Sequence, residues 1–248
     1  MPTGATNKKK YTYVWVSAII LIFGIFAVYE ITKRVGEGTV VENDRMTLPN
    51  NQSSIGFVIS NGQKRKVPEF SFLNQDSTVV TNADYLGKVY VVEFFFSTCP
   101  TICPIMTKNL VELQDAFKDY PEFGVASFTI NPRYDTPGIL KKYAGKYGIT
   151  DPDWHLMTGD RDKIYSLAQE GFYIVANEDE SAPGGFEHSG MFALVDKNGN
   201  IRSRNDEFGN PLIYYRGTIT EKQGVSAEGE AQQITILKED IKKLLLEE

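Results

Sequence analysis

The chain has 248 residues, of which 42% are hydrophobic and 23% are charged. This composition is typical of a globular protein and excludes a chain that is mainly disordered, collagen-like or coiled-coil. A net charge of -6 argues against nucleic-acid binding, which needs clustered lysines and arginines to contact phosphates. Two cysteines are too few for a disulfide scaffold.

The N-terminal segment has the pattern of a membrane anchor. Three lysines at residues 8–10 precede an uncharged run from Tyr11 to Tyr29. Extended to Ile31, this run would form a helix of about 30 Å, the thickness of a bilayer core. The leading lysines predict that residues 1–10 stay in the cytoplasm, with the rest of the chain across the inner membrane in the periplasm. A cleaved signal peptide is the alternative, but the run ends in "YEITKR" without a small-residue cleavage site. We therefore expect a single-pass transmembrane anchor at residues 11–31.

A polar segment follows the expected anchor. Residues 32–66 show little periodicity, and "IGFVIS" is the one short strand expected among them. We interpret this segment as a tether. The compact domain is then expected to occupy residues 67–248.

Strands and helices alternate along the expected domain. The patterns predict a hairpin at 69–82, strands at 88–96 and 123–130, helices at 105–117, 135–148 and 160–172, a hairpin formed by 191–196 and 200–204, and a terminal helix at 234–248. The strand at 88–96 is almost entirely β-branched or aromatic, as expected of a central buried strand. This order predicts a layered α/β domain.

Both cysteines lie in "FFFSTCPTICPIM", at the carboxyl end of the strand 88–96. If a helix begins near Cys99 or Pro100, then Cys99 and Cys103 lie on the same helical face, four residues apart. The positive end of the helix dipole would then lower the pKa of both thiols. The pair could be a structural disulfide closing a very small loop, a redox couple or two ligands of a metal ion.

A histidine is the expected third ligand in the case of a metal site. His155 follows a tryptophan at the start of a strand, where a half-buried, hydrogen-bonded histidine is expected. His188 follows the glycines of "APGGFEHSG", which suit a mobile loop, and it precedes a core strand. Two thiolates and one imidazole suit Cu(I), and Cu(II) can also accept them, whereas structural zinc usually needs a fourth protein ligand. Three methionines could add thioether ligands, although they are more typical of core filling: Met106, Met157 and Met191.

Three segments resemble the Sco/SenC/PrrC family. "FFFSTCPTICPIM" resembles its CPxxCP motif, "INPRYDTP" its D-P-x-R-D-T-P segment, and "HSGMFALVDKNGN" its histidine followed by a strand and turn. The resemblance covers roughly residues 67 to 246. It implies a thioredoxin-like fold, a central mixed sheet flanked by helices, that binds one copper ion through Cys99, Cys103 and His188.

The function that the resemblance implies is that of a membrane-anchored copper chaperone rather than an enzyme. Family members deliver copper to the binuclear copper centre of cytochrome c oxidase subunit II, or keep its thiols reduced. Either role requires a thiol-reductant partner on the outer side of the membrane. Asn131, Tyr134 and Glu187 depart from the family pattern and change the charges expected around the site. Asp135 is retained, and we expect it to cap the helix 135–148 first and to act beside the site or on a partner second.

Other functions of a thioredoxin-like fold remain open. A thiol–disulfide oxidoreductase would use Cys99 and Cys103 as its redox-active pair, but thioredoxin-type enzymes have two residues between the cysteines instead of three. A redox or copper sensor would have the same site. A peroxiredoxin is not expected, because neither cysteine lies in its P-x-x-x-T-x-x-C pattern.

Overall fold

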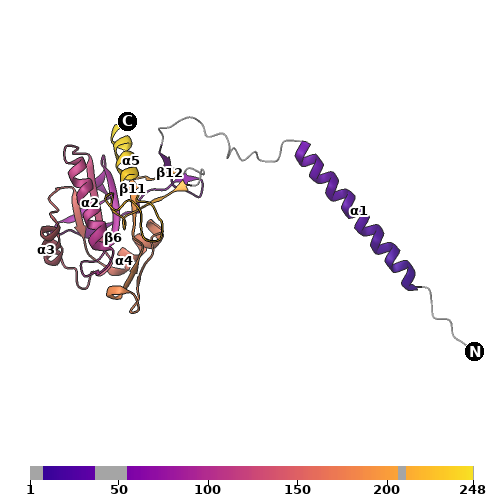
Figure 1. The fold of residues 1–248 in the computed structure, drawn as a ribbon, viewed down its shortest axis with the longest axis horizontal. Helices are drawn as coiled ribbons and strands as arrows, with labels where there is room; N and C mark the ends of the chain where they lie inside the picture. The colour runs from indigo at the N-terminus through magenta and orange to yellow at the C-terminus, as the bar shows by residue number, and fades with distance from the viewer. Residues whose placement is uncertain (1–7, 37–54, 206–210, 248) are drawn as a thin grey trace, which may run out of the picture. The chain divides into compact units, whose positions relative to one another are not determined.

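The chain divides into two units, residues 1–50 and residues 51–248 (Figure 1). The computed structural model describes residues 8–36, 55–205 and 211–247. Within these ranges, only the backbone is described for residues 8–13, 31–32, 34–36 and 188. The structure therefore places His188 by its backbone alone.

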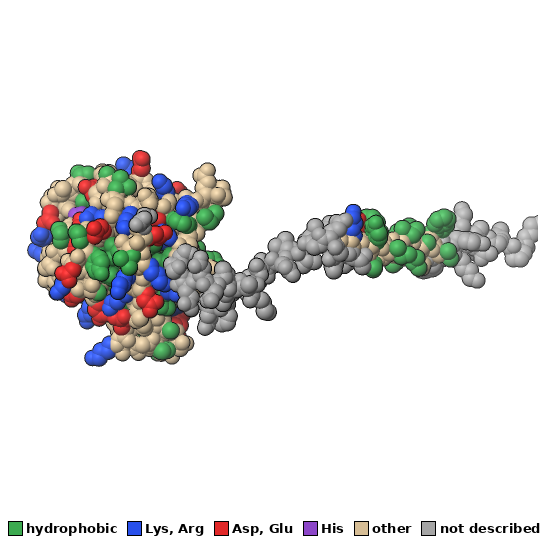
Figure 2. All heavy atoms as spheres, turned by 90° about the horizontal axis from the view of Figure 1, so that it is seen from above, with side chains coloured by type: hydrophobic (Ala, Val, Ile, Leu, Met, Phe, Trp, Pro, Cys, Tyr) green, Lys and Arg blue, Asp and Glu red, His purple; other side chains and the backbone are tan. Residues whose placement is uncertain are grey.

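The described part of the first unit is the helix α1 (Lys8–Gly36). Between Val14 and Tyr29 its side chains are largely apolar and exposed, and Figure 2 shows hydrophobic side chains along this part of the helix. No helix in the described part of the chain is both long enough and apolar enough to cross a membrane. The transmembrane anchor at residues 11–31 stays a prediction.

A mixed sheet forms the centre of the second unit. Its strands run in the order β1–β12–β11–β6–β7–β8, with β14 also beside β11 and β13 also beside β12. Their bounds are β1 (Gly56–Phe57), β6 (Val89–Phe95), β7 (Phe123–Thr129), β8 (Trp154–Met157), β11 (Met191–Val195), β12 (Ile201–Asn205), β13 (Pro211–Leu212) and β14 (Tyr214–Arg216). β6, β7 and β8 are parallel, and β11 runs antiparallel to β6. The predicted α/β fold with a central mixed sheet is confirmed.

The central strands form where the sequence is most apolar. Every residue of β6 and of β7 is buried, as expected for strands covered on both faces. The predicted hairpins are also present: β4 (Ser71–Leu73) pairs with β5 (Val79–Thr81), and β11 pairs with β12. Gly199, in the turn between β11 and β12, has a φ of 76°, which favours glycine.

The folded unit begins earlier in the chain than expected. β1, β2 (Ile59–Ser60) and β3 (Gln63–Lys64) lie within residues 32–66, which the sequence suggested as a tether. β1 pairs with β12 in the main sheet, and Ile55 and Val58 are buried. β2 and β3 pair with each other, whereas β1 pairs with a strand about 145 residues further along the chain (Phe57 with Arg202), a contact that no local pattern in the sequence signals.

Helices cover the sheet on both faces. They are α2 (Cys103–Phe117), α3 (Pro137–Tyr147), α4 (Arg161–Ser166), the π-helical turn η2 (Leu167–Gly171) and α5 (Ile234–Leu246). α2 contacts both α3 and α5, and Figure 1 shows it running beside β6. α3 begins after Thr136 and ends at Gly148, whose φ of 75° and N–H bond to the Ala144 carbonyl close the helix as predicted.

Alternate residues of β6 and β7 point to opposite faces of the sheet. On the face we call the aromatic face, Phe94 and Phe128 stack with ring centroids 5.4 Å apart, and rings from the chain around them pack on this pair: Phe70, Phe72 and Phe172. On the other face, which we call the α2 face, lie Glu93, Phe95, Ser127 and Thr129. Phe95 contacts Tyr143 of α3 at 5.4 Å between centroids, so α3 and its neighbour α2 cover this second face.

Candidate metal centre

The cysteine segment connects β6 to α2. β6 ends at Phe95, the Cys99 N–H donates to the Phe96 carbonyl at 3.2 Å, and α2 begins at Cys103. The expectation that both cysteines lie on one helical face is therefore wrong: Cys103 opens the helix and Cys99 lies in the preceding loop. The physical reason is the two Cys–Pro pairs. Pro100 disfavours a helical conformation for the residue before it, while Pro104 fits the first turn.

The two cysteines are buried at the carboxyl end of the central strand. Cys99 is 7% exposed and Cys103 is 1% exposed, and both are present as thiols. The Cys99 sulfur lies 3.6 Å from the Thr101 hydroxyl oxygen. Burial raises the pKa of Cys103 far above its ordinary value, and a hydrogen bond with Cys99 raises it further. The expected lowering by the helix dipole is wrong for Cys103, because desolvation outweighs it.

Asp135, which follows β7 in the chain, is hydrogen-bonded to the loop that carries Cys99. Its carboxylate is fully buried and accepts hydrogen bonds from the Ser97 N–H at 3.0 Å, from the Ser97 hydroxyl and from the Thr129 hydroxyl. The expected capping role is not observed, since Thr136 occupies the N-cap and Asp135 turns toward the loop. Three donors compensate the burial of this carboxylate. They also fasten the loop two residues before Cys99.

His188 lies on a small hairpin and not in an open loop. Its backbone belongs to β10 (Phe186–His188), which pairs antiparallel with β9 (Ala176–Glu178). Glu178 of β9 forms an ion pair with Arg161 of α4 at 2.7 Å, which ties the hairpin to the helix. The mobile loop expected around His188 is therefore partly ordered by strand pairing.

The residues flanking His188 pack on the cysteine loop. The rings of Phe186 and Phe96 lie 5.0 Å apart. A Cβ added to Gly184 would lie 2.8 Å from the Phe96 ring and 3.1 Å from the Pro100 ring. On the other side, a Cβ at Gly190 would lie 3.5 Å from the Ile102 side chain. The backbone on both sides of His188 thus contacts the segment that carries the two cysteines.

The structure describes part of the expected ligand set. Cys99 and Cys103 interact directly, whereas the His188 imidazole lies outside the described side chains. Among the described side chains, no group of three or more His, Cys, Asp or Glu residues is arranged to hold a metal ion. Glu187, beside His188, is exposed and pairs with Asn177 in the hairpin.

The remaining candidate ligands lie within the fold as expected. His155 is half-buried, with Nδ1 3.3 Å from the Asn74 amide nitrogen and its ring against Tyr85. Burial lowers the pKa of His155, and surrounding carboxylates oppose that effect. Met106 and Met157 are fully buried in the core.

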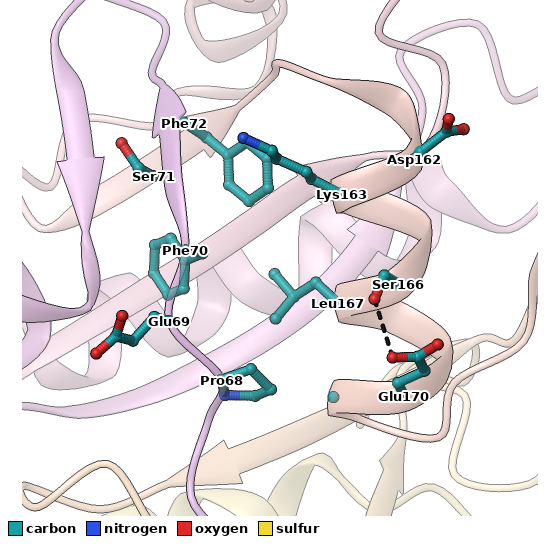
Figure 3. Close-up of a pocket in the computed structure, with 11 residues that line it drawn as sticks. Pro68, Glu69, Phe70, Ser71, Phe72, Asp162, Lys163, Ser166, Leu167 and Glu170 are labelled. Carbon is teal, nitrogen blue, oxygen red and sulfur yellow. Dashed lines mark hydrogen bonds between the residues drawn. The ribbon is translucent and has the colours of Figure 1, made fainter.

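A hollow on the aromatic face is separate from the cysteines. It has a volume of about 870 Å³ and lies between residues 68–72 and α4 with η2 (Figure 3). Phe70, Phe72 and Leu167 line its apolar side, and Lys163 and Glu170 lie along the helix that borders it. Its lining contains none of the expected metal ligands.

One buried polar residue of β6 was not predicted from the sequence. Glu93 is 1% exposed in the middle of β6, and burial raises its pKa to about 7, while a hydrogen bond from Ser127 partly opposes this. The signal was present in the sequence, because Glu93 is the one charged residue in the run "VYVVEFFF". A carboxylate in a strand buried on both faces is unusual without a partner or a function.

The fold and the buried cysteine pair define a thioredoxin-like α/β protein with its dithiol at the end of the central strand. The sequence profile of the SCO1/SenC family matches residues 59–216. The SCO1 protein homolog of Bacillus subtilis is 31% identical over 138 residues, which cover 55% of this chain and 71% of that protein. The chain belongs to the SCO1/SenC family.

Solved structures agree with this assignment. A SCO1/SenC family lipoprotein from Bacillus anthracis has a TM-score of 0.60 and 27% identity, and covers 73% of this chain and 95% of its own. BsSco, described by its disulfide switch and as a member of the Sco family of cytochrome c oxidase assembly proteins, has a TM-score of 0.59 and 26% identity, over 77% of this chain and 99% of its own. Copper-bound ScoI of Bradyrhizobium japonicum shares the fold, with a TM-score of 0.51 and 18% identity, over 72% of this chain and 99% of its own.

Proposed function

We propose that this chain is a copper chaperone that binds one copper ion through Cys99, Cys103 and His188. The observation that carries the proposal is the contact between the two elements that bear these residues. The cysteine loop and the hairpin of His188 pack through Phe96 and Phe186. Two soft thiolates with an imidazole suit Cu(I), and the set also accepts Cu(II). Membership of a family with copper-bound structures supports the same metal.

Copper uptake requires both cysteines to lose their protons. The thiolate is the metal-binding form, and burial holds Cys103 in its thiol form without a metal. Copper supplies the positive charge that stabilises two thiolates in this buried place. Copper is then released to a partner by ligand exchange, in which the partner's ligands replace one thiolate at a time. His188 is the third ligand, and its hairpin can move away from the cysteine loop as copper leaves.

The recipient that we propose is the binuclear copper centre of cytochrome c oxidase subunit II. The description of BsSco as a member of a family of cytochrome c oxidase assembly proteins supports this choice. The two thiols must be kept reduced between cycles, so a thiol-reductant protein is the second proposed partner. The alternative role is reduction of the recipient's cysteines by Cys99 and Cys103. The disulfide switch described for BsSco supports this alternative.

We also propose that residues 11–31 attach the chain to the inner membrane, with residues 1–10 cytoplasmic and the folded unit in the periplasm. The uncharged run behind three lysines supports this location, as does the lipoprotein description of the Bacillus anthracis relative. Cell fractionation followed by protease treatment of spheroplasts tests it. Recovery of the intact folded unit in the soluble cytoplasmic fraction would contradict the proposal.

Titration of the full chain with Cu(I) under reducing conditions tests the copper site. We expect one copper per chain, and a double variant Cys99→Ser/Cys103→Ser should lose binding. His188→Ala should keep the fold. Because it removes one ligand, it should weaken copper binding by roughly 10-fold or more. His155→Ala is the matched control, because it removes the other histidine of the chain and should leave copper affinity unchanged. Equal affinities for His188→Ala and wild type would overturn the three-ligand site.

The same variants separate the chaperone from the thiol reductase. A reductase acts through the dithiol alone, so His188→Ala would reduce a disulfide-containing subunit II fragment at the wild-type rate. A chaperone loses copper transfer in that variant. Reduction of the fragment by wild type and by His188→Ala at the same rate, with no reduction by the cysteine variants, would favour the reductase role.

A further inference from the structure

Asn109 is a fully buried asparagine on α2, six residues after Cys103. Its side-chain nitrogen donates to two backbone carbonyls, that of Gly217 at 2.8 Å and that of Ile219 at 3.2 Å. Both N–H groups of the amide are thereby used. The segment that accepts them, residues 217–219, follows β14 in the chain. A single amide therefore joins α2 to a segment that begins 108 residues further along the sequence.

The 217–219 segment in turn contacts the backbone that carries His188. The Gly217 N–H donates to the Gly190 carbonyl at 2.8 Å, and this bond continues the pairing of β11 with β14. A Cβ added to Gly190 would collide with the Thr218 methyl group, so the lack of a side chain at Gly190 permits this contact. The backbone two residues beyond His188 is thus fixed to the segment that Asn109 holds.

A second buried amide on α2 is bonded in a different way. The Gln114 amide donates to the Gly148 carbonyl at 3.2 Å, and its oxygen accepts from the N–H groups of Thr150 at 2.9 Å and Asp151 at 3.0 Å. The oxygen of Asn109, Oδ1, is buried and has no hydrogen-bond partner among the described residues. An unpaired buried acceptor costs stability. The Asn109 amide therefore contributes through its two donated bonds alone.

We propose, on the basis of the copper site proposed above, that Asn109 is a positioning residue for His188. One helix carries Cys103 at its start and Asn109 about 9 Å further along its axis. The Asn109 amide fixes the 217–219 segment to this helix, and the same segment fixes Gly190. The separation between the Cys103 backbone and the His188 backbone is therefore set by these hydrogen bonds.

The hydrogen bonds fix a geometry that apolar packing of the hairpin does not. The rings of Phe96 and Phe186 hold the hairpin against the cysteine loop, but apolar packing is not directional. The bonds from Asn109 are directional. A site binds its metal tightly only when its supporting contacts hold the ligands within about 0.5 Å of the required geometry. Loss of these bonds should loosen His188 and leave the two cysteines, which α2 and the Asp135 bonds hold, in place.

Asn109→Leu tests the proposal, because leucine has a similar volume and no donor. In Cu(I) titrations the full-length variant should still bind one copper per chain, with an affinity roughly 10-fold lower than wild type, as expected for His188→Ala. Gln114→Leu is the matched control: it removes a buried amide of the same helix and should destabilise the fold without changing copper affinity. Hydrogen exchange of the copper-free proteins gives a second readout. The Gly217 N–H should exchange faster in Asn109→Leu and at the wild-type rate in Gln114→Leu.

The double variant Asn109→Leu/His188→Ala tests whether Asn109 acts through the histidine. If it does, the double variant should bind copper as His188→Ala does, because the two losses are not additive. Asn109→Ser, whose shorter side chain cannot reach both carbonyls, should weaken copper binding as Asn109→Leu does and keeps the test independent of the folding of that variant.

Two results would overturn the positioning role of Asn109. One is wild-type copper affinity in Asn109→Leu or Asn109→Ser while His188→Ala binds more weakly. The other is a double variant in which the two losses add in full. Wild-type affinity in His188→Ala is a different outcome, and it would overturn the three-ligand site on which this proposal rests.

Discussion

The two faces of β6 and β7 are built from the same strands but differ in chemistry. The aromatic face pairs Phe94 with Phe128 under further rings, and the residues of both strands on this face are apolar. The α2 face places Glu93, Ser127 and Thr129 among apolar neighbours, all fully or almost fully buried. Burial of apolar groups stabilises a fold, whereas burial of a carboxyl group costs stability unless it is compensated. The aromatic face therefore contributes stability, whereas the α2 face bears the cost of the buried Glu93 carboxyl.

The largest effect should come from removing a ring of the aromatic face. Phe128→Ala deletes a fully buried ring that contacts Phe70, Phe72 and Phe94, and it should lower the free energy of unfolding by about 3–5 kcal/mol. Copper affinity of the fraction that stays folded should be unchanged. Phe95→Ala, which removes a ring of the α2 face, should cost similar stability and also weaken copper binding. Denaturant unfolding and Cu(I) titration of both variants check this, and equal copper affinities would break the division between the faces.

The buried carboxyl of Glu93 should make stability depend on pH. Its folded pKa of about 7 lies above the ordinary value of 4.5, so the folded state binds the proton more tightly than the unfolded state does. The stabilisation that this proton gives the folded state is fully present below about pH 4.5 and is lost as pH rises through about 7. Relative to Glu93→Gln, wild type should lose roughly 3 kcal/mol of unfolding free energy between about pH 4.5 and pH 8. Chemical denaturation of the copper-free proteins across this range measures the difference, and a constant difference would contradict the burial effect.

Asp135 differs from Glu93 on the same face, because hydrogen bonds from Ser97 and Thr129 compensate the burial of its carboxylate. Asp135→Asn removes the charge that accepts from Ser97 and Thr129, and it should destabilise the fold by about 1–3 kcal/mol. Because Ser97 leads into Cys99, the variant should also bind copper more weakly. Asp119→Asn, at an exposed side chain beyond the end of α2, is the matched control and should change neither property. Unfolding and Cu(I) titrations in parallel check both, and wild-type copper affinity in Asp135→Asn would show that the Ser97 bonds do not position the loop.

The parts of this fold that the sequence predicted are those set by local pattern. β-branched and aromatic runs identified β6 and β7, and Pro137 and Gly148 identified the two ends of α3. The parts it did not predict depend on contacts between distant residues. The bonds from Asp135 to Ser97 join positions 38 residues apart, and no local spacing signals them. Both possible helix starts in "CPTICP" also satisfy local rules, so the position of Cys99 outside α2 required the structure.

The smallest effect should come from the N-cap of α4, at the edge of the aromatic face. The Asp160 carboxylate accepts from the Lys163 N–H at 2.9 Å, and the helix that follows buries Ile164 against the core. Asp160→Ala leaves that N–H without its partner and should lower the free energy of unfolding by about 1 kcal/mol. Asp160→Asn keeps a capping oxygen and should lose much less. Because α4 covers the face opposite the cysteines but also holds the His188 hairpin through Arg161, copper affinity in Asp160→Ala is a sensitive check. An unchanged affinity supports separate roles for the two faces, whereas a loss would show that the start of α4 is coupled to the copper site through the ion pair of Arg161 with Glu178.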